Sequence, residues 1–114
     1  MFNWLVRFIE RQRKGYCYED LWSFDNFLSQ FIASALREFK LRCYTYPNNI
    51  NSWEEWMAIL DEMIECFAEQ RRGIDNISRD QDFLDTYQER MKNKKAKLHR
   101  GLELLELYYF DLWD

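Results

Sequence analysis

Four stretches of the chain repeat apolar residues at intervals of three and four positions, the spacing of one helix face. The first runs from Phe2 to Arg13 and is followed by Gly15, a residue type that suits the position just past a helix end. Its apolar face consists of Trp4, Leu5, Phe8 and Ile9. We expect this face to pack into the core of the protein.

The second stretch, from about Glu19 to Arg42, has the widest apolar stripe. The stripe contains Leu21, Phe24, Leu28, Phe31 and Ala35, widened by Trp22, Phe27, Ile32, Leu36 and Phe39. This width predicts the most buried helix of the fold. Beyond it, Tyr46-Pro47-Asn48-Asn49 predicts a turn, because Pro47 cannot continue a helix and asparagine favours turns.

The third stretch opens with Ser52-Trp53-Glu54-Glu55, which is a capping box. In this motif the serine side chain accepts from the backbone amide of Glu55, and the glutamate reaches back to the residue before the helix. The apolar positions that follow are Trp53, Trp56, Met57, Leu60, Met63, Ile64 and Phe67. Gly73 predicts the helix end, and residues 74–80 are expected to form a short polar connection.

The fourth stretch, from about Asp82 to Trp113, has a near-heptad stripe. Its members are Leu84, Tyr87, Met91, Leu98, Leu102, Leu105, Tyr109 and Leu112. Gly101 interrupts it, and a glycine inside a helix costs about 1 kcal/mol relative to alanine. One continuous helix, a kinked helix and two helices that meet near Arg100 all fit this pattern.

The four stretches predict an all-α protein, a compact bundle of about four to five helices in one domain that spans residues 1–114. The chain is 47% hydrophobic and 32% charged, a balance that excludes disorder for most of its length. Its three cysteines, Cys17, Cys43 and Cys66, are widely spaced and odd in number, which argues against a disulfide framework and a thiolate metal site. No apolar run approaches the about 20 residues that span a bilayer. We therefore expect a soluble protein of a reducing cytoplasm.

Aromatic residues make up 18% of the chain, more large rings than the core of one small domain can hide. Exposed Trp, Tyr and Phe are the usual anchors of protein interfaces. The composition therefore favours a protein that binds other proteins.

The sequence contains no recognisable catalytic or metal-binding constellation. His99 is the only histidine and lies among lysines, where a surface position is the simplest interpretation. A di-iron bundle would need a glutamate where Ala96 stands. Asp61 with Glu65, or Glu65 with Glu69, could hold a cation, but a solvated helix face explains their spacing better. We expect a protein that is not an enzyme and carries no cofactor.

Two blocks of charge of opposite sign lie on the third and fourth stretches. The acidic block, which we predict to bind protein together with Trp53, is Glu54, Glu55, Asp61, Glu62, Glu65 and Glu69. The basic block offers Lys92, Lys94, Lys95, Lys97 and Arg100 as candidate nucleic-acid contacts. Mutual neutralisation of the two blocks is the stronger alternative, so we expect nucleic acid not to be a direct ligand. If they do not pair, the third helix becomes an anionic surface that fits a basic groove on a partner.

The first stretch is also basic and amphipathic, a pattern typical of helices that lie on a membrane surface. A single short helix with few charges anchors weakly, and its apolar residues are needed for the core. We therefore expect no membrane contact.

Several short motifs occur in an order that resembles a family of small proteins encoded in tailed-phage genomes. They are Arg13-Lys14-Gly15-Tyr16, Glu19-Asp20-Leu21-Trp22-Ser23-Phe24-Asp25, Tyr46-Pro47, Glu54-Glu55-Trp56 and Phe110-Asp111-Leu112-Trp113-Asp114. The chain departs from the family pattern at Cys17, where a serine-like cap is expected, and at Tyr44-Thr45, where a His-Gly pair is expected. The resemblance implies a phage origin and no catalytic residue.

Taken with the aromatic content and the acidic block, the resemblance implies an accessory protein that acts in the cytoplasm of an infected bacterial host. We expect it to bind and inhibit or redirect a host protein, such as a nucleic-acid-handling defence factor, in the manner of an anti-CRISPR inhibitor. Two alternatives remain open. One is a structural or assembly component of the virion or replication apparatus, for which a homodimer is one arrangement. The other is a nucleic-acid-binding regulator.

Overall fold

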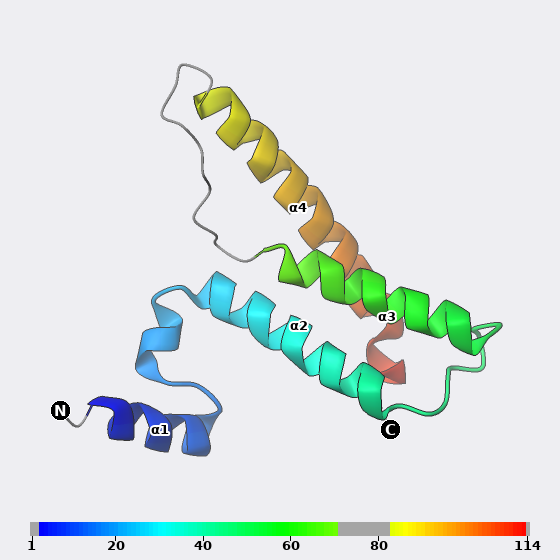
Figure 1. Ribbon diagram of the computed structural model, residues 1–114, viewed down its shortest axis with the longest axis horizontal. Coiled ribbons are helices and arrows are strands. Elements are labelled where there is room, and N and C mark those ends of the chain that lie inside the picture. Colours follow the sequence, from blue (N-terminus) through cyan, green and yellow to red (C-terminus); the bar gives the residue numbers. More distant parts are fainter. Residues whose placement is uncertain (1–2, 71–82, 114) are drawn as a thin grey trace.

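The computed structural model describes residues 3–70 and 83–113, and the described residues form an all-α bundle without strands (Figure 1). In chain order the elements are α1 (Asn3–Lys14), the 3₁₀ turn η1 (Tyr18–Leu21), α2 (Phe24–Arg42), α3 (Trp53–Ala68), α4 (Phe83–Tyr108) and the 3₁₀ turn η2 (Tyr109–Asp111). The predicted fold class is confirmed. The predicted stop at Gly73 and the connection over residues 74–80 lie outside the described residues.

The end of α1 follows the glycine signal in the sequence. Gly15 has a φ of 85°, a backbone conformation that residues with a Cβ rarely adopt. Its amide donates to the carbonyl of Arg11 over 2.9 Å, which closes the last turn of the helix.

The second predicted helix begins later than expected, which corrects the start at Glu19. Residues 18–21 form η1, and Ser23 has non-helical backbone angles, φ −130° and ψ 62°, before α2 starts at Phe24. The physical reason is local capping: the Asp20 carboxylate accepts from the amide of Cys17 over 2.9 Å and so closes a separate short turn.

The start of α3 and the turn before it are confirmed. Ser52 accepts from the amide of Glu55 over 3.1 Å, and the Glu55 carboxylate accepts from the amide of Asn51 over 3.2 Å. In the preceding turn, the amide of Ile50 donates to the carbonyl of Pro47 over 3.0 Å.

The core of the bundle lies along α3, which packs between α2 and α4. Six residues of α3 are buried, and they are Trp56, Leu60, Met63, Ile64, Cys66 and Phe67. The wider stripe of α2 buries only Ser29, Ala33 and Leu36. The prediction that the second stretch would be the most buried helix is therefore wrong, because α2 packs along one side and no helix of the described chain covers its other side.

One continuous helix spans residues 83–108, so α4 passes through Gly101 without ending there. The glycine lies where α4 crosses α3: a Cβ built on it would be 2.9 Å from the Cβ of Cys66 and 3.2 Å from the ring of Phe67. Close approach of the two helices explains why a glycine stands in the interior of this helix.

The molecule is a slab with principal extents of 50 × 43 × 19 Å. Figure 1, drawn down the shortest axis, shows α1, α2 and α3 spread out without overlapping, so little of each helix is covered by the others. This shape accounts for the many large rings that remain at the surface.

Candidate protein-binding surface

The apolar side of α1 faces away from the rest of the molecule. Trp4 is 68% exposed and Phe8 is 55% exposed, and α1 has no buried residue. The other exposed apolar residues of this helix are Leu5, Val6 and Ile9. The prediction that Trp4, Leu5, Phe8 and Ile9 build the core is therefore wrong. We call the five exposed apolar residues of this helix the outer face of α1, and they are Trp4, Leu5, Val6, Phe8 and Ile9.

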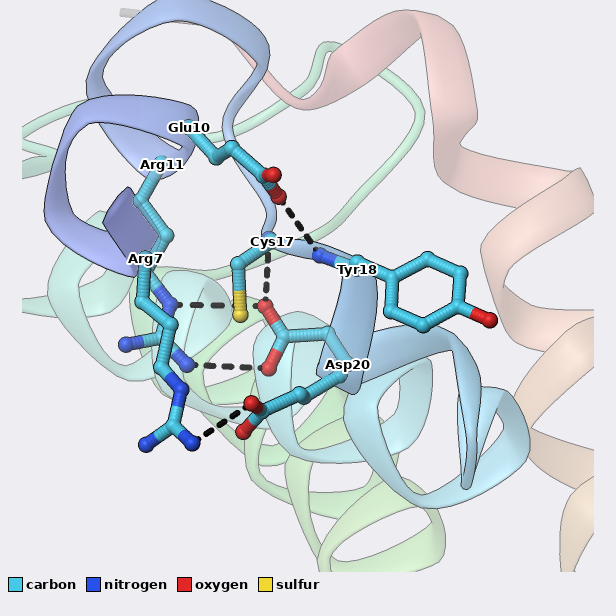
Figure 2. Close-up of polar contacts among 7 residues, drawn as sticks. Arg7, Glu10, Arg11, Cys17, Tyr18 and Asp20 are labelled. Carbon is cyan, nitrogen blue, oxygen red and sulfur yellow. Dashed lines mark hydrogen bonds and ion pairs between the residues drawn. The ribbon is translucent and has the colours of Figure 1, made fainter. Parts of the chain in front are cut away.

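Two arginines of α1 hold the helix to η1 by ion pairs, as Figure 2 shows. Arg7 Nη2 lies 2.5 Å from Glu19 Oε1, and Arg11 Nη2 lies 3.0 Å from Asp20 Oδ1. Since residues 7 and 11 are one helical turn apart, both guanidinium groups project from the same side. The two ion pairs therefore hold this side of α1 against η1, and Leu5, Val6 and Ile9 lie on the opposite side of the helix.

Two backbone amides add hydrogen bonds to this contact between α1 and η1 (Figure 2). We call the ion pairs and these hydrogen bonds together the clasp. Glu10 accepts from the amide of Tyr18 over 2.7 Å, and Asp20 accepts from the amide of Cys17. The hydrogen bond from Arg11, together with the hydrogen bonds from Cys17, holds the pKa of the Asp20 carboxyl below its usual value. Asp20 therefore stays ionised through the pH range in which the clasp forms.

A second uncovered apolar strip follows on α2. Phe24, Leu28 and Phe31 recur at intervals of four and three residues, so they share one side of the helix, and all three are exposed. Leu21 and Trp22 beside η1 are exposed as well. The region from residue 4 to residue 31 thus presents much of its apolar surface outward.

The acidic block of α3 is largely occupied by cations of the same chain. Glu62 lies 2.7 Å from Arg100, and Asp61 lies 2.6 Å from Lys40 of α2. Glu69 forms an ion pair with Lys97. Three of the six acids that we predicted to bind protein are therefore paired within the chain.

The remaining members of that predicted site have different surroundings. Glu55 serves the capping box, and Trp53 is half-buried and packs against the core. Glu54 and Glu65 are exposed and form no ion pair with the residues that the structure describes. Only these two carboxylates are available for a partner without loss of an internal contact.

The basic block of α4 also falls into two groups, residues that pair with acids of the same chain and residues that form no such pair with the described part of the chain. Lys97 and Arg100 pair with α3, which confirms for these two residues that the charge blocks face each other. Lys92 and Lys95 are exposed, and Lys94 is half-buried. Nucleic-acid binding by this block stays a prediction.

The chemical groups that the sequence singled out are dispersed. His99 lies at the surface, 3.7 Å from Glu103. The three cysteines are buried and form no disulfide with one another, and burial raises the pKa of the Cys66 thiol. Over residues 3–70 and 83–113 no three His, Cys, Asp or Glu side chains are grouped so that they could hold a metal ion. Within the same residues no helix is both long enough and apolar enough to cross a membrane.

Sequence reasoning missed the outer face of α1 because an apolar stripe does not specify what covers it. One signal was present: Arg7 and Arg11 lie one turn apart, and Glu19 and Asp20 follow after the helix end. Complementary charges at that separation fit a helix that folds back with its polar side inward.

A scan of this chain against protein-family models, a search of curated proteins and a search of solved structures each found no match.

Proposed function

We propose that this chain is a phage accessory protein that binds a host protein and inhibits or redirects it. The observation that supports this function is the outer face of α1, an amphipathic helix with its apolar side turned outward and its polar side clasped to η1. The motif resemblance supports the phage origin, and host defence proteins that handle nucleic acids are the class of target we favour.

The outer face of α1 has the form of a helix that inserts into an apolar groove of a partner. Trp4 with Phe8, and Leu5 with Ile9, are pairs one turn apart that serve as successive anchors. Full burial of one such side chain contributes about 1.5–3 kcal/mol. Because α1 is already helical and held by the clasp, less conformational freedom is lost on binding than with a disordered segment.

Positive charges at the C-terminal end of α1 would make the proposed binding more selective. Arg13 and Lys14 are exposed and form no ion pair with the described residues, whereas Arg7 and Arg11 are taken up by the clasp. A groove with an acidic rim would complement them and speed association. Glu54 and Glu65 on α3 remain a second, separate candidate contact for a basic partner surface.

Self-assembly is the second candidate function, and the same outer face favours it. Two copies of α1 could cover each other in a homodimer, as expected of a structural or assembly component. The two functions differ in the partner and therefore in the experiment that supports them.

The test is a pull-down of tagged protein from host lysate after nuclease treatment, compared between variants. The double substitution Trp4→Ala with Phe8→Ala removes two anchors from α1. Phe110→Ala is the matched control, because Phe110 is the most exposed of the large hydrophobic side chains and lies in η2. Glu54→Lys with Glu65→Lys tests the acidic surface of α3.

We expect the α1 double variant to lose a specific host protein that the wild-type chain and the Phe110 variant retain. Loss only in the α3 variant would move the contact to the acidic surface. Capture that is equal in all variants would contradict both surfaces. Concentration-dependent dimerisation of the purified chain that the α1 double variant loses, with no host protein captured, would support self-assembly.

A further inference from the structure

A cleft of 340 Å³ lies at the end of the bundle opposite to the clasp, between the turn after α2 and the C-terminal η2. Its wall contains four aromatic rings, and they belong to Phe39, Tyr46, Trp56 and Trp113. These rings come from α2, the 46–49 turn, α3 and the segment after η2. Three successive segments from the middle of the chain therefore meet the distant C-terminal segment at one cleft.

The aromatic side chains of the cleft differ in how far they are buried. Trp56 is 1% exposed and packs edge to face on Tyr108, with their centroids 5.6 Å apart, so it forms a fixed floor. Trp113 is 73% exposed and Tyr46 is 44% exposed, so both present free ring surface to an incoming group. A rigid floor with two accessible rings is a site that can stack a planar ligand group.

One carboxylate lies among these rings. Asp111 is the only charged residue among the described residues that line the cleft, and it is half-buried. No cation of the described residues forms an ion pair with it, in contrast to Asp61, Glu62 and Glu69 elsewhere on the surface. The cleft therefore combines aromatic faces with an unneutralised negative charge.

We propose that this cleft binds the side chain of an arginine carried by a partner polypeptide. A guanidinium group is planar and can stack on Trp113 or Tyr46 while its N–H groups donate to the Asp111 carboxylate. A lysine ammonium satisfies the charge but lacks the flat surface. The volume lies at the lower end of the range of about 300–1,000 Å³ for ligand pockets, which suits one side chain with its flanking backbone.

This site is independent of the proposed contact through α1. The cleft is built from residues 39–56 and 111–113, whereas the outer face of α1 is built from residues 4–9. A partner could be bound at one site without the other, so each site is tested by its own variants.

The test uses a short peptide with one central arginine between alanines, titrated into the full chain while the indole N–H signals are followed by NMR. A citrulline peptide is the control ligand, since citrulline keeps the shape of arginine and removes its charge. Asp111→Asn is the main variant, with Glu65→Gln as the control for loss of an exposed carboxylate elsewhere. Trp113→Ala is a second variant, followed through the Trp56 signal, because an exposed ring can be removed without disturbing the core.

We expect saturable shifts of the Trp113 and Trp56 signals with the arginine peptide and none with the citrulline peptide. Asp111→Asn should weaken binding about tenfold or more, the effect expected for loss of a charge-assisted hydrogen bond. Trp113→Ala should also weaken it, and Glu65→Gln should not. Equal binding of citrulline, unchanged affinity in the Asp111 variant, or absence of saturable shifts would overturn the proposal. Binding of free guanidinium ion as tight as that of the peptide would replace the polypeptide partner by a small cation.

Discussion

The helices α1 and α3 are both amphipathic in sequence, and the structure treats their apolar sides in opposite ways. In α3 the apolar side is buried between two neighbouring helices, and Leu60 and Met63 are fully covered. In α1 the apolar side is exposed and the polar side faces the molecule. The difference lies in the polar sides. Arg7 and Arg11 find carboxylates in η1, and this contact turns the apolar side of α1 outward.

The comparison shows that apolar periodicity predicts a helix face and leaves open what covers that face. A helix end that folds back against complementary charges can reverse the usual orientation without any change in the apolar pattern. The apolar residues of α1 are exposed and those of α3 form the core, which is why we propose a binding role for the former.

The largest expected effect contrasts the two apolar sides directly. Leu60→Ala in α3 should lower the free energy of unfolding by about 2–5 kcal/mol, because it leaves a cavity in a closed core. Phe8→Ala in α1 should change it by no more than about 0.5 kcal/mol, since an exposed side chain leaves no cavity. Urea denaturation of both variants measures the difference. A comparable loss in the Phe8 variant would show that α1 packs on the core.

The next effect concerns the crossing of α3 and α4. Gly101→Ala should lower the free energy of unfolding by about 1–3 kcal/mol through overpacking against Cys66 and Phe67. Higher helix propensity of alanine offsets about 1 kcal/mol of this loss. Lys95→Ala, at an exposed position of the same helix, is the control and should have little effect. A stabilised Gly101 variant would mean that the two helices do not approach closely.

A smaller and local effect is expected at the clasp. The pKa of Asp20 is lowered in the folded chain, so its contribution is present above the unfolded pKa and is lost as the pH falls through the folded pKa, below 3.8. Protection of the α1 amides relative to the unfolded chain should fall in that range of pH, and Asp20→Asn should lower it at neutral pH. Exchange in α3 should not change in the variant. Equal protection of the α1 amides in wild type and variant would show that the clasp does not hold α1 in place.

The smallest effect is expected for the ion pairs between α3 and α4. Glu62→Gln should change the unfolding midpoint little at physiological salt, because surface pairs are screened and costly to order. The difference between variant and wild type should disappear in high salt. A large, salt-independent loss would show that Glu62 and Arg100 contribute much more than their exposed positions imply.

Several local features of the fold could be predicted from the sequence because short-range chemistry determines them. The glycine after α1, the Ser52 cap and the proline turn each act within a few residues, and all three are confirmed. The other half of the predicted capping box differs, because Glu55 accepts from the amide of Asn51 and not from that of Ser52. The facing of Lys97 and Arg100 toward α3 also followed from their charge.

The errors concern contacts between distant segments. The stripe of α2 is wide enough to cover two neighbours, yet among the described α-helices α3 alone packs closely on it, so Phe24 and Phe31 stay exposed. Gly101 signalled a possible break, but the close crossing with Cys66 accounts for it within one helix. The meeting of Trp56, Trp113 and Asp111 at one cleft depends on the same long-range packing and has no local signal.

The most direct test of the outward orientation of α1 and of its proposed role is a photo-crosslinking residue at position 8, irradiated in host lysate. We predict an adduct with a host protein, and no such adduct when the same group replaces the exposed Phe110. An adduct with a second copy of the chain would support self-assembly through the same face. An adduct within the chain, to a residue of α2, α3 or α4, would contradict the account because it would place Phe8 against the core.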